Sequence, residues 1–187
     1  MFPDFLSQSV DKVAQKLLGC ELIRILDGQT IRVRIVETES YDQTDAASHS
    51  FKGRTPRTDV MFGSSGYLYV YFTYGMHFCC NIVTGQEGVG EAVLIRAVEP
   101  LQGIEQLVKK RKKSGVEVTN GPAKLSQALG IDKTLNGHDL HVDPLQLIAR
   151  PQLSSSEIIH ATRIGISVEK DKLRRFYIKD NPYVSKP

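Results

Sequence analysis

The chain begins with two different spacings of apolar residues. Residues 9–19 place apolar side chains three or four positions apart, as in an amphipathic helix, and the stripe consists of Val10, Val13, Ala14, Leu17 and Leu18. Residues 21–26 and 30–39 are rich in β-branched residues, and Asp27-Gly28 between them is a strong hairpin signal. We therefore expect a helix followed by two antiparallel strands.

Strand patterns outnumber helical patterns in the rest of the chain. Further strands are expected at residues 67–72, 77–83, 92–98, 163–168 and 174–178. A short helix is predicted from Asn120 through Leu129, because Pro122 would stand in its first turn, where a missing N–H costs nothing. The basic stretch 109–120 is expected to form a mobile loop or a frayed helix end. These elements predict one α+β domain over residues 1–187, with a curved, mainly antiparallel β-sheet flanked by helices and a protruding β-hairpin.

Composition excludes some classes of protein. Hydrophobic residues make up 41% of the chain and charged residues 24%, as in ordinary globular domains. No apolar run approaches the roughly 18 residues that span a membrane, and the first residues lack the pattern of a signal peptide, so we expect a cytoplasmic protein. Cys20, Cys79 and Cys80 show no metal-ligand spacing, so we expect no disulfide, metal or cofactor.

The distribution of charge says more than the net value of +3. Basic residues cluster at 52–57, 109–113 and 172–175. Basic loops on one face could bind the phosphates of a nucleic acid, whereas solvated surface charge is the alternative for each cluster. The polar connection 42–66 is long for a compact domain, and such loops are usually functional. It contains His49, which taken alone is typical of polar surface.

Two glutamates end a strand face that is otherwise apolar. If side chains alternate strictly, one side of the strand carries Ile31, Val33, Ile35, Glu37, Glu39 and, if the strand continues, Tyr41. A carboxylate beside the core is costly unless it is paired or used. Spacing does not choose between Glu37 and Glu39, and both could instead lie beyond the core edge in solvent.

Tyrosines are concentrated in the second predicted strand pair. Tyr67, Tyr69 and Tyr71 alternate along one strand, and Tyr74 stands at the tip of the hairpin. A core does not require so many, because each buried hydroxyl needs a partner. Tyr74, flanked by Gly75, could insert between base pairs as DNA-bending proteins do. The alternative is a strand stabilised by cross-strand aromatic pairs.

One arginine, Arg96, interrupts the apolar run 92–98. A buried guanidinium must meet a carboxylate, a phosphate or backbone carbonyls. Glu91 and Glu99 face the other side of the same strand, so the partner must come from elsewhere, and Glu39 is a candidate.

An ordered set of segments resembles the alkyladenine (3-methyladenine, methylpurine) DNA glycosylase family. The segments cover residues 34–41, 47–50, 53–57, 60–63, 69–71, 74–76, 81–83, 94–101, 121–125, 163–166 and 175–177. Each is weak alone, but their order along almost the whole chain is highly specific. The resemblance implies a base-excision repair enzyme that flips alkylated or deaminated purines out of double-stranded DNA and hydrolyses their N-glycosidic bond.

The resemblance also implies catalytic roles. Glu39, rather than Glu37, matches the general base that activates water for attack on the sugar. Arg96 and the backbone carbonyl of Ile166 match groups that hold this water.

Recognition roles follow in the same way. Tyr41, His49 and Tyr71 match the walls that sandwich the flipped base, and Asn81 matches the residue that would clash with the 2-amino group of normal guanine. Tyr74 matches the side chain that fills the gap left in the duplex.

The resemblance is accompanied by a geometric condition and two competing hypotheses. Tyr71 and Asn81 can share a pocket only if an odd-numbered loop or a bulge joins their strands. A non-catalytic nucleic-acid-binding module is the main alternative to an active, monomeric glycosylase, and a hydrolase of free nucleosides is a weaker one. The inward carboxylate of Glu39 favours an enzyme.

Overall fold

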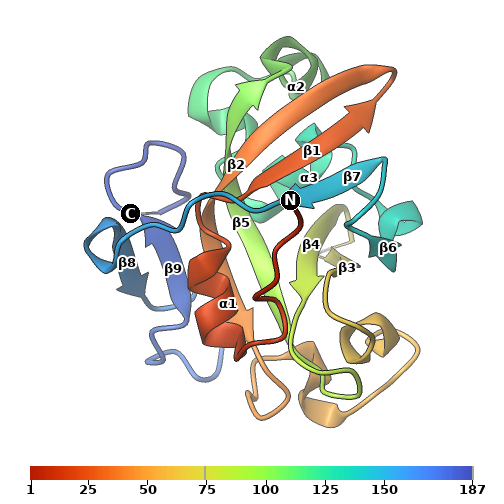
Figure 1. The fold of residues 1–187 in the computed structure, drawn as a ribbon, viewed down its shortest axis with the longest axis vertical. Coiled ribbons are helices and arrows are strands. Elements are labelled where there is room, and N and C mark those ends of the chain that lie inside the picture. The colour runs from red at the N-terminus through yellow and green to blue at the C-terminus, as the bar shows by residue number, and fades with distance from the viewer. Residues whose placement is uncertain (74, 187) are drawn as a thin grey trace.

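The computed structural model describes residues 1–73 and 75–186, which fold around one curved sheet (Figure 1). The α-helices are α1 (Val10–Lys16), α2 (Ile104–Arg111) and α3 (Pro122–Ala128). The strands are β1 (Glu21–Leu26), β2 (Gln29–Tyr41), β3 (Tyr67–Thr73), β4 (His77–Val83), β5 (Ala92–Gln102), β6 (His138–Asp139), β7 (Leu145–Ile148), β8 (Ile158–Ala161) and β9 (Arg175–Ile178). Two short 3-10 helices, His49–Lys52 and Asp59–Phe62, lie in the connection between β2 and β3.

The strands of the described residues pair antiparallel, in the order β6-β3-β4-β5-β2-β1-β7, and β9 joins β2 and β8 beside this path. β6 and β7 stand at opposite ends of the order, yet the backbone N–H of Leu147 donates to the carbonyl of Leu140, which follows β6. The sheet must therefore curl until its two edges approach. The predicted α+β class with a curved antiparallel sheet is confirmed.

The main core lies on the face of the sheet that α1 covers (Figure 1). The predicted stripe of α1 is buried there against β2, and residues of α3 join the same cluster. A smaller cluster packs between the 3-10 helix at 59–62 and strands β3, β4 and β5, with Met61, Phe62, Tyr69, Val83 and Ala92 as its buried members. This smaller cluster supports the opposite face of the sheet, where the functional site lies.

A β-bulge interrupts the alternation of β2. Ile35 pairs with Val98 of β5, but Glu37 pairs with Ala97, so Val36 is an extra residue on β2. The register shifts again between Glu37 and the next residue. Such a bulge turns the side chains that follow it to the other face of the sheet.

The bulge decides where the two glutamates point. Beyond it, the hydroxyls of Thr38 and Ser40 donate hydrogen bonds to α1, on the core side. Glu37, Glu39 and Tyr41 therefore share the opposite face. The strand does continue to Tyr41, as the sequence allowed, but the prediction that these three residues share a side with the apolar residues before them is wrong, because it assumed unbroken alternation.

The β3–β4 hairpin satisfies the condition for a shared pocket. Tyr71 pairs with Cys79 and Tyr69 pairs with Asn81, so the strands are joined by the odd-numbered loop 74–76. These four side chains consequently lie on one face of the hairpin. Tyr74, the predicted intercalating residue, lies outside the described residues.

One predicted strand is absent from the structure. Residues 163–168 form a loop, not a strand, and the strand before it is β8. The alternation of apolar residues there is that of a strand, but Gly165 adopts a φ of 79°, which breaks the extended path. The basic stretch 109–120, predicted as a mobile loop or a frayed helix end, begins with the last turn of α2, which ends at Arg111 and buries only Leu107. No helix of the described residues is long and apolar enough to span a membrane.

Candidate active site

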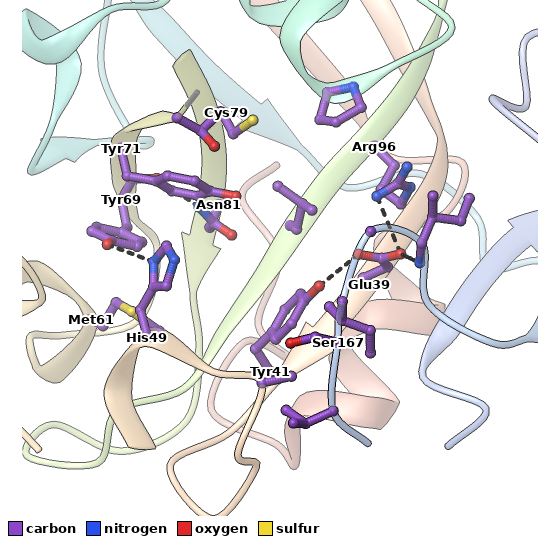
Figure 2. A pocket seen from close by; sticks show the side chains of 18 of the residues that line it. Glu39, Tyr41, His49, Met61, Tyr69, Tyr71, Cys79, Asn81, Arg96 and Ser167 are labelled. Carbon is purple, nitrogen blue, oxygen red and sulfur yellow. Dashed lines mark hydrogen bonds and ion pairs between the residues drawn. The ribbon is translucent and has the colours of Figure 1, made fainter. Parts of the chain in front are cut away.

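A pocket of about 520 Å³ opens on the face of the sheet opposite α1. It is lined by strands β2, β3, β4 and β5, by the connection after β2 and by the loop 164–168. Figure 2 shows Tyr41 and Glu39 on one side of the pocket and His49 with Tyr71 on the other. Glu39, Tyr41, His49, Tyr71, Asn81, Arg96 and Ile166 all line it, so the structure brings together every described residue that the resemblance selected.

Glu39 is fully buried at the inner end of the pocket. Its Oε2 accepts a hydrogen bond of 2.8 Å from the Tyr41 hydroxyl, and its Oε1 accepts one of 2.8 Å from the backbone N–H of Ile164. Arg96 Nη1 lies 3.2 Å from the same Oε1. A buried polar group is costly unless it is hydrogen-bonded, and these partners also fix the orientation of the carboxylate.

Glu37 is equally buried but does not line the pocket. Arg175 Nη1 donates to its Oε1 at 2.8 Å, and the backbone N–H of Ser185 donates to its Oε2 at 2.7 Å. Arg96 Nε lies 3.4 Å from Glu37 Oε1, so Arg96 stands between the two carboxylates. The choice between Glu37 and Glu39 that spacing left open is therefore made by the pocket, and the predicted pairing of Arg96 with Glu39 is confirmed.

Aromatic rings form the wall opposite Glu39. The rings of His49 and Tyr71 meet edge to face with centroids 4.6 Å apart, and Tyr69 stacks beside Tyr71 at 5.7 Å. His49 Nδ1 lies 3.0 Å from the Tyr69 hydroxyl, within hydrogen-bonding distance. Although His49 as a residue is exposed, partial burial of its ring in the pocket, followed by the charge of Arg57, lowers its pKa to about 4. The imidazole is therefore neutral near pH 7.

Tyr41 connects the aromatic part of the pocket with the carboxylate of Glu39. Burial, followed by the charge of Glu39, raises the pKa of Tyr41, so its hydroxyl stays protonated and donates to Glu39. Asn81 is oriented by a hydrogen bond of 3.1 Å from its Nδ2 to the carbonyl of Tyr69. The pocket can thus accept a flat ring between aromatic side chains and present the atom beyond it to Glu39.

The structure adds residues that the sequence did not single out for this site. The backbone N–H of Ile164 contacts Glu39, Tyr69 supports the aromatic wall, and the guanidinium of Arg57 lies 5.8 Å from the Tyr71 ring. Tyr69 belonged to the noted tyrosine strand and Arg57 to a noted basic cluster. No local pattern marks Ile164, because its role depends on a backbone group.

No group of His, Cys, Asp or Glu in the described part of the chain is arranged to hold a metal ion. Cys79 faces the pocket and Cys80 faces the main core, as expected for neighbours on a strand. The polar groups at the inner end of the pocket are a carboxylate, a guanidinium and a backbone N–H, which suit water and a proton transfer.

Comparison with known proteins agrees with this site. A family model described as Methylpurine-DNA glycosylase matches residues 4–182. A protein of Carboxydothermus hydrogenoformans is 50% identical over 97% of this chain and 96% of its own length, and one of Methanoculleus marisnigri is 44% identical over the same shares. A Desulfitobacterium hafniense relative is 46% identical over 92% of each chain. All three carry the name "Putative 3-methyladenine DNA glycosylase".

A match of this length covers the sheet, the pocket and the loops that line it. The protein is a DNA repair hydrolase of the DNA glycosylase class. Within that class, the chain belongs to the methylpurine-DNA glycosylase family.

Proposed function

We propose that this protein is a monofunctional glycosylase that hydrolyses the N-glycosidic bond of alkylated or deaminated purines, including 3-methyladenine, 7-methylguanine, hypoxanthine and ethenoadenine. The observation that carries the proposal is the fully buried carboxylate of Glu39 at the inner end of an aromatic pocket. The substrate is duplex DNA, and the enzyme acts as a monomer. A carboxylate in this position would serve no purpose in a protein that only bound DNA phosphates, because it would repel them.

The reaction assigns one role to each group around Glu39. Glu39 accepts a proton from a water molecule, whose oxygen forms a bond to the sugar C1′. The bond between C1′ and the purine nitrogen breaks, and its electrons leave with the base. Arg96 and the backbone carbonyl of Ile166 hold the water during this attack. Arg96 Nη1 also lies 3.2 Å from Glu39 Oε1 and so helps to orient the carboxylate.

The aromatic residues select the base. A purine must first leave the duplex, which costs a few kcal/mol and is cheapest at a damaged pair. The base then lies between Tyr41 on one side and His49 with Tyr71 on the other. A methylated purine carries positive charge, so these rings attract it by about 0.5–2 kcal/mol in cation–π energy. A neutral His49 does not oppose this attraction.

Two further residues complete the recognition of DNA in this proposal. Asn81 excludes normal guanine by contact with its 2-amino group. Tyr74 fills the space that the flipped nucleotide leaves in the duplex.

Base release by Glu39→Gln tests the mechanism. Duplexes that carry one hypoxanthine, ethenoadenine or 3-methyladenine are incubated with wild type, with Glu39→Gln and with Glu99→Gln. Glu99 is the matched control, because it is a carboxylate of the neighbouring strand that pairs with Arg34 and does not line the pocket. We expect release by wild type and Glu99→Gln only. If Glu39→Gln released base as fast as wild type, Glu39 would not be the base, and if wild type bound duplexes without releasing any base, the non-catalytic alternative would hold.

A further inference from the structure

A buried ion pair lies beside the pocket and is not part of its lining. The side chains of Asp45 and Arg163 are both fully buried, and they come from the two loops that border the pocket. Removing two charges from water costs free energy that their mutual attraction does not always recover. The contacts of this pair with the two loops indicate its role.

Arg163 is fixed on three sides. Its Nη2 donates to Asp45 Oδ1 at 3.0 Å, Nη1 also contacts Asp45, and Nη1 donates to the backbone carbonyl of Ser40 at 3.1 Å. Its guanidinium lies 4.6 Å from the centroid of the Tyr41 ring. Arg163 therefore contacts one aromatic wall of the pocket directly.

The peptide bond that follows Arg163 reaches Glu39. This peptide carries the N–H of Ile164, which donates to Glu39 Oε1 at 2.8 Å. The loop has no ladder of strand hydrogen bonds to hold it in place, since residues 162–168 form no strand. The anchored side chain of Arg163 thus sets the position of the N–H group that orients the carboxylate.

Asp45 fixes the other border of the pocket. Its Oδ1 accepts a hydrogen bond of 3.0 Å from the N–H of Ala47, and its backbone carbonyl accepts one of 2.8 Å from Ser48. Ala47 and the following His49 line the pocket. Burial alone would raise the pKa of Asp45, but hydrogen bonds from Arg163 and the Ala47 amide lower it, so the carboxyl of Asp45 stays ionised.

We propose that Asp45 and Arg163 are positioning residues, which hold the Ile164 N–H on Glu39 and the His49 loop at the distance that the reaction requires. This inference rests on the proposed function. Neither residue touches the substrate, so their loss is expected to slow the chemical step more than it weakens the binding of DNA.

Single-turnover kinetics on a duplex with one hypoxanthine separate these effects. Wild type, Arg163→Lys, Asp45→Asn and the control Glu21→Gln are compared at a temperature at which circular dichroism shows each to be folded. Lysine keeps the charge of Arg163 but cannot make the paired bonds to Asp45. Glu21 is a buried partner of Arg32 and Arg150 on β1, away from the pocket. Exchange of the Ile164 amide is followed by NMR in the same proteins.

We expect Arg163→Lys and Asp45→Asn to lower the rate at saturating enzyme by about 100-fold, the cost typical of a misplaced catalytic group. In these two variants the enzyme concentration that gives half the maximal rate should change little, and the Ile164 amide should exchange faster. Glu21→Gln should resemble wild type in all three measurements. A wild-type rate in folded Arg163→Lys, or an equal loss in Glu21→Gln, would overturn the inference. If wild type released no base, the proposed function would fail, and Ile164 exchange would decide the inference: faster exchange in Arg163→Lys than in Glu21→Gln supports it, and equal exchange refutes it.

Discussion

The hydroxyl of Tyr41 donates a hydrogen bond of 2.8 Å to the carboxylate of Glu39, two residues earlier on the same strand. One side chain thus serves two purposes, because its ring forms a wall of the pocket and its hydroxyl orients the proposed base. The two side chains face the same side because they are two residues apart on a regular stretch of β2, and the bulge before them turns that side toward the pocket.

Tyr41→Phe separates the two purposes. It keeps the ring and removes one of the partners of Glu39, and a hydrogen bond to a charged group contributes about 1.5–3 kcal/mol. We expect the rate of base release at saturating enzyme to fall by about 10-fold or more. DNA affinity, measured by fluorescence anisotropy, should be nearly unchanged. An unchanged rate would show that the hydroxyl does not orient Glu39.

Glu37→Gln tests the support beneath the site. Glu37 is buried with Arg175 and Arg96, so the substitution leaves buried positive charge uncompensated. Breaking a buried pair in this way costs about 3–5 kcal/mol in the free energy of unfolding. The control Glu99→Gln removes a half-exposed partner of Arg34, which is worth at most about 1 kcal/mol. Urea unfolding measures the free energy of unfolding of both variants. An equal loss of stability in Glu37→Gln and Glu99→Gln would contradict the prediction.

The stability of the protein should depend on pH through His49. Its pKa is about 4 in the folded chain, below the ordinary value of 6.5, so the folded state favours the neutral ring. This contribution is complete above pH 6.5 and is lost as the pH falls toward 4. The contribution of His49 to the free energy of unfolding is small, because the residue is exposed and solvent screens its charge.

Urea unfolding at pH 7 and pH 5 measures this dependence. We expect His49→Asn to lose less stability between the two pH values than wild type loses. The same loss in both proteins would show that other groups account for it.

Asn81→Ala should relax discrimination against guanine. Asn81 is held toward the pocket by its bond to the Tyr69 carbonyl, and its removal leaves room for a 2-amino group. We expect the release of normal guanine from undamaged duplex to rise by about 10-fold, a size typical of discrimination by shape. Chromatography of the released bases measures this. If guanine release stays at the wild-type level while hypoxanthine release is retained, Asn81 is not the excluding residue.

Tyr74→Ala should weaken binding to DNA. Loss of an aromatic side chain stacked against bases costs about 1–3 kcal/mol in binding free energy. Tyr67→Ala is the matched control, because Tyr67 is a partly exposed tyrosine at the start of β3. Anisotropy with a lesion-containing duplex compares the two variants, and equal affinity of Tyr74→Ala and wild type would remove the intercalating role.

Local patterns in the sequence predicted most of the fold. The stripe of α1, the Asp27-Gly28 hairpin, β5 and the proline that begins α3 each depend on residues close together in the chain, and each is found. One pattern misled. Apolar alternation at 163–168 predicted a strand, but this segment is a loop, and residues 164–168 line the pocket. The basic stretch 109–120 predicted a mobile loop or a frayed helix end, and α2 ends within it at Arg111.

The candidate site was predicted by resemblance rather than by spacing. Spacing marked Glu37 and Glu39 as unusual and could not rank them, because residues two apart on a strand share one face. It also marked Arg96 as needing a distant partner, and the structure supplies two. It gave no sign of Asp45 or Arg163 as a pair, since 118 residues separate them.

The sequence by itself determined the α+β class, the two main hairpins and the residue types that a DNA glycosylase site needs, because period, turn chemistry and ordered motifs are local properties of the chain. Only the tertiary structure decided which glutamate faces the pocket and what holds it. The bulge in β2 turns both glutamates away from the main core, and distant contacts then distinguish them. Arg175 donates to Glu37, whereas the backbone N–H of Ile164 reaches Glu39 in the pocket across 125 residues. Contacts of this kind form only when the folded sheet brings distant backbone groups together, so no local pattern records them.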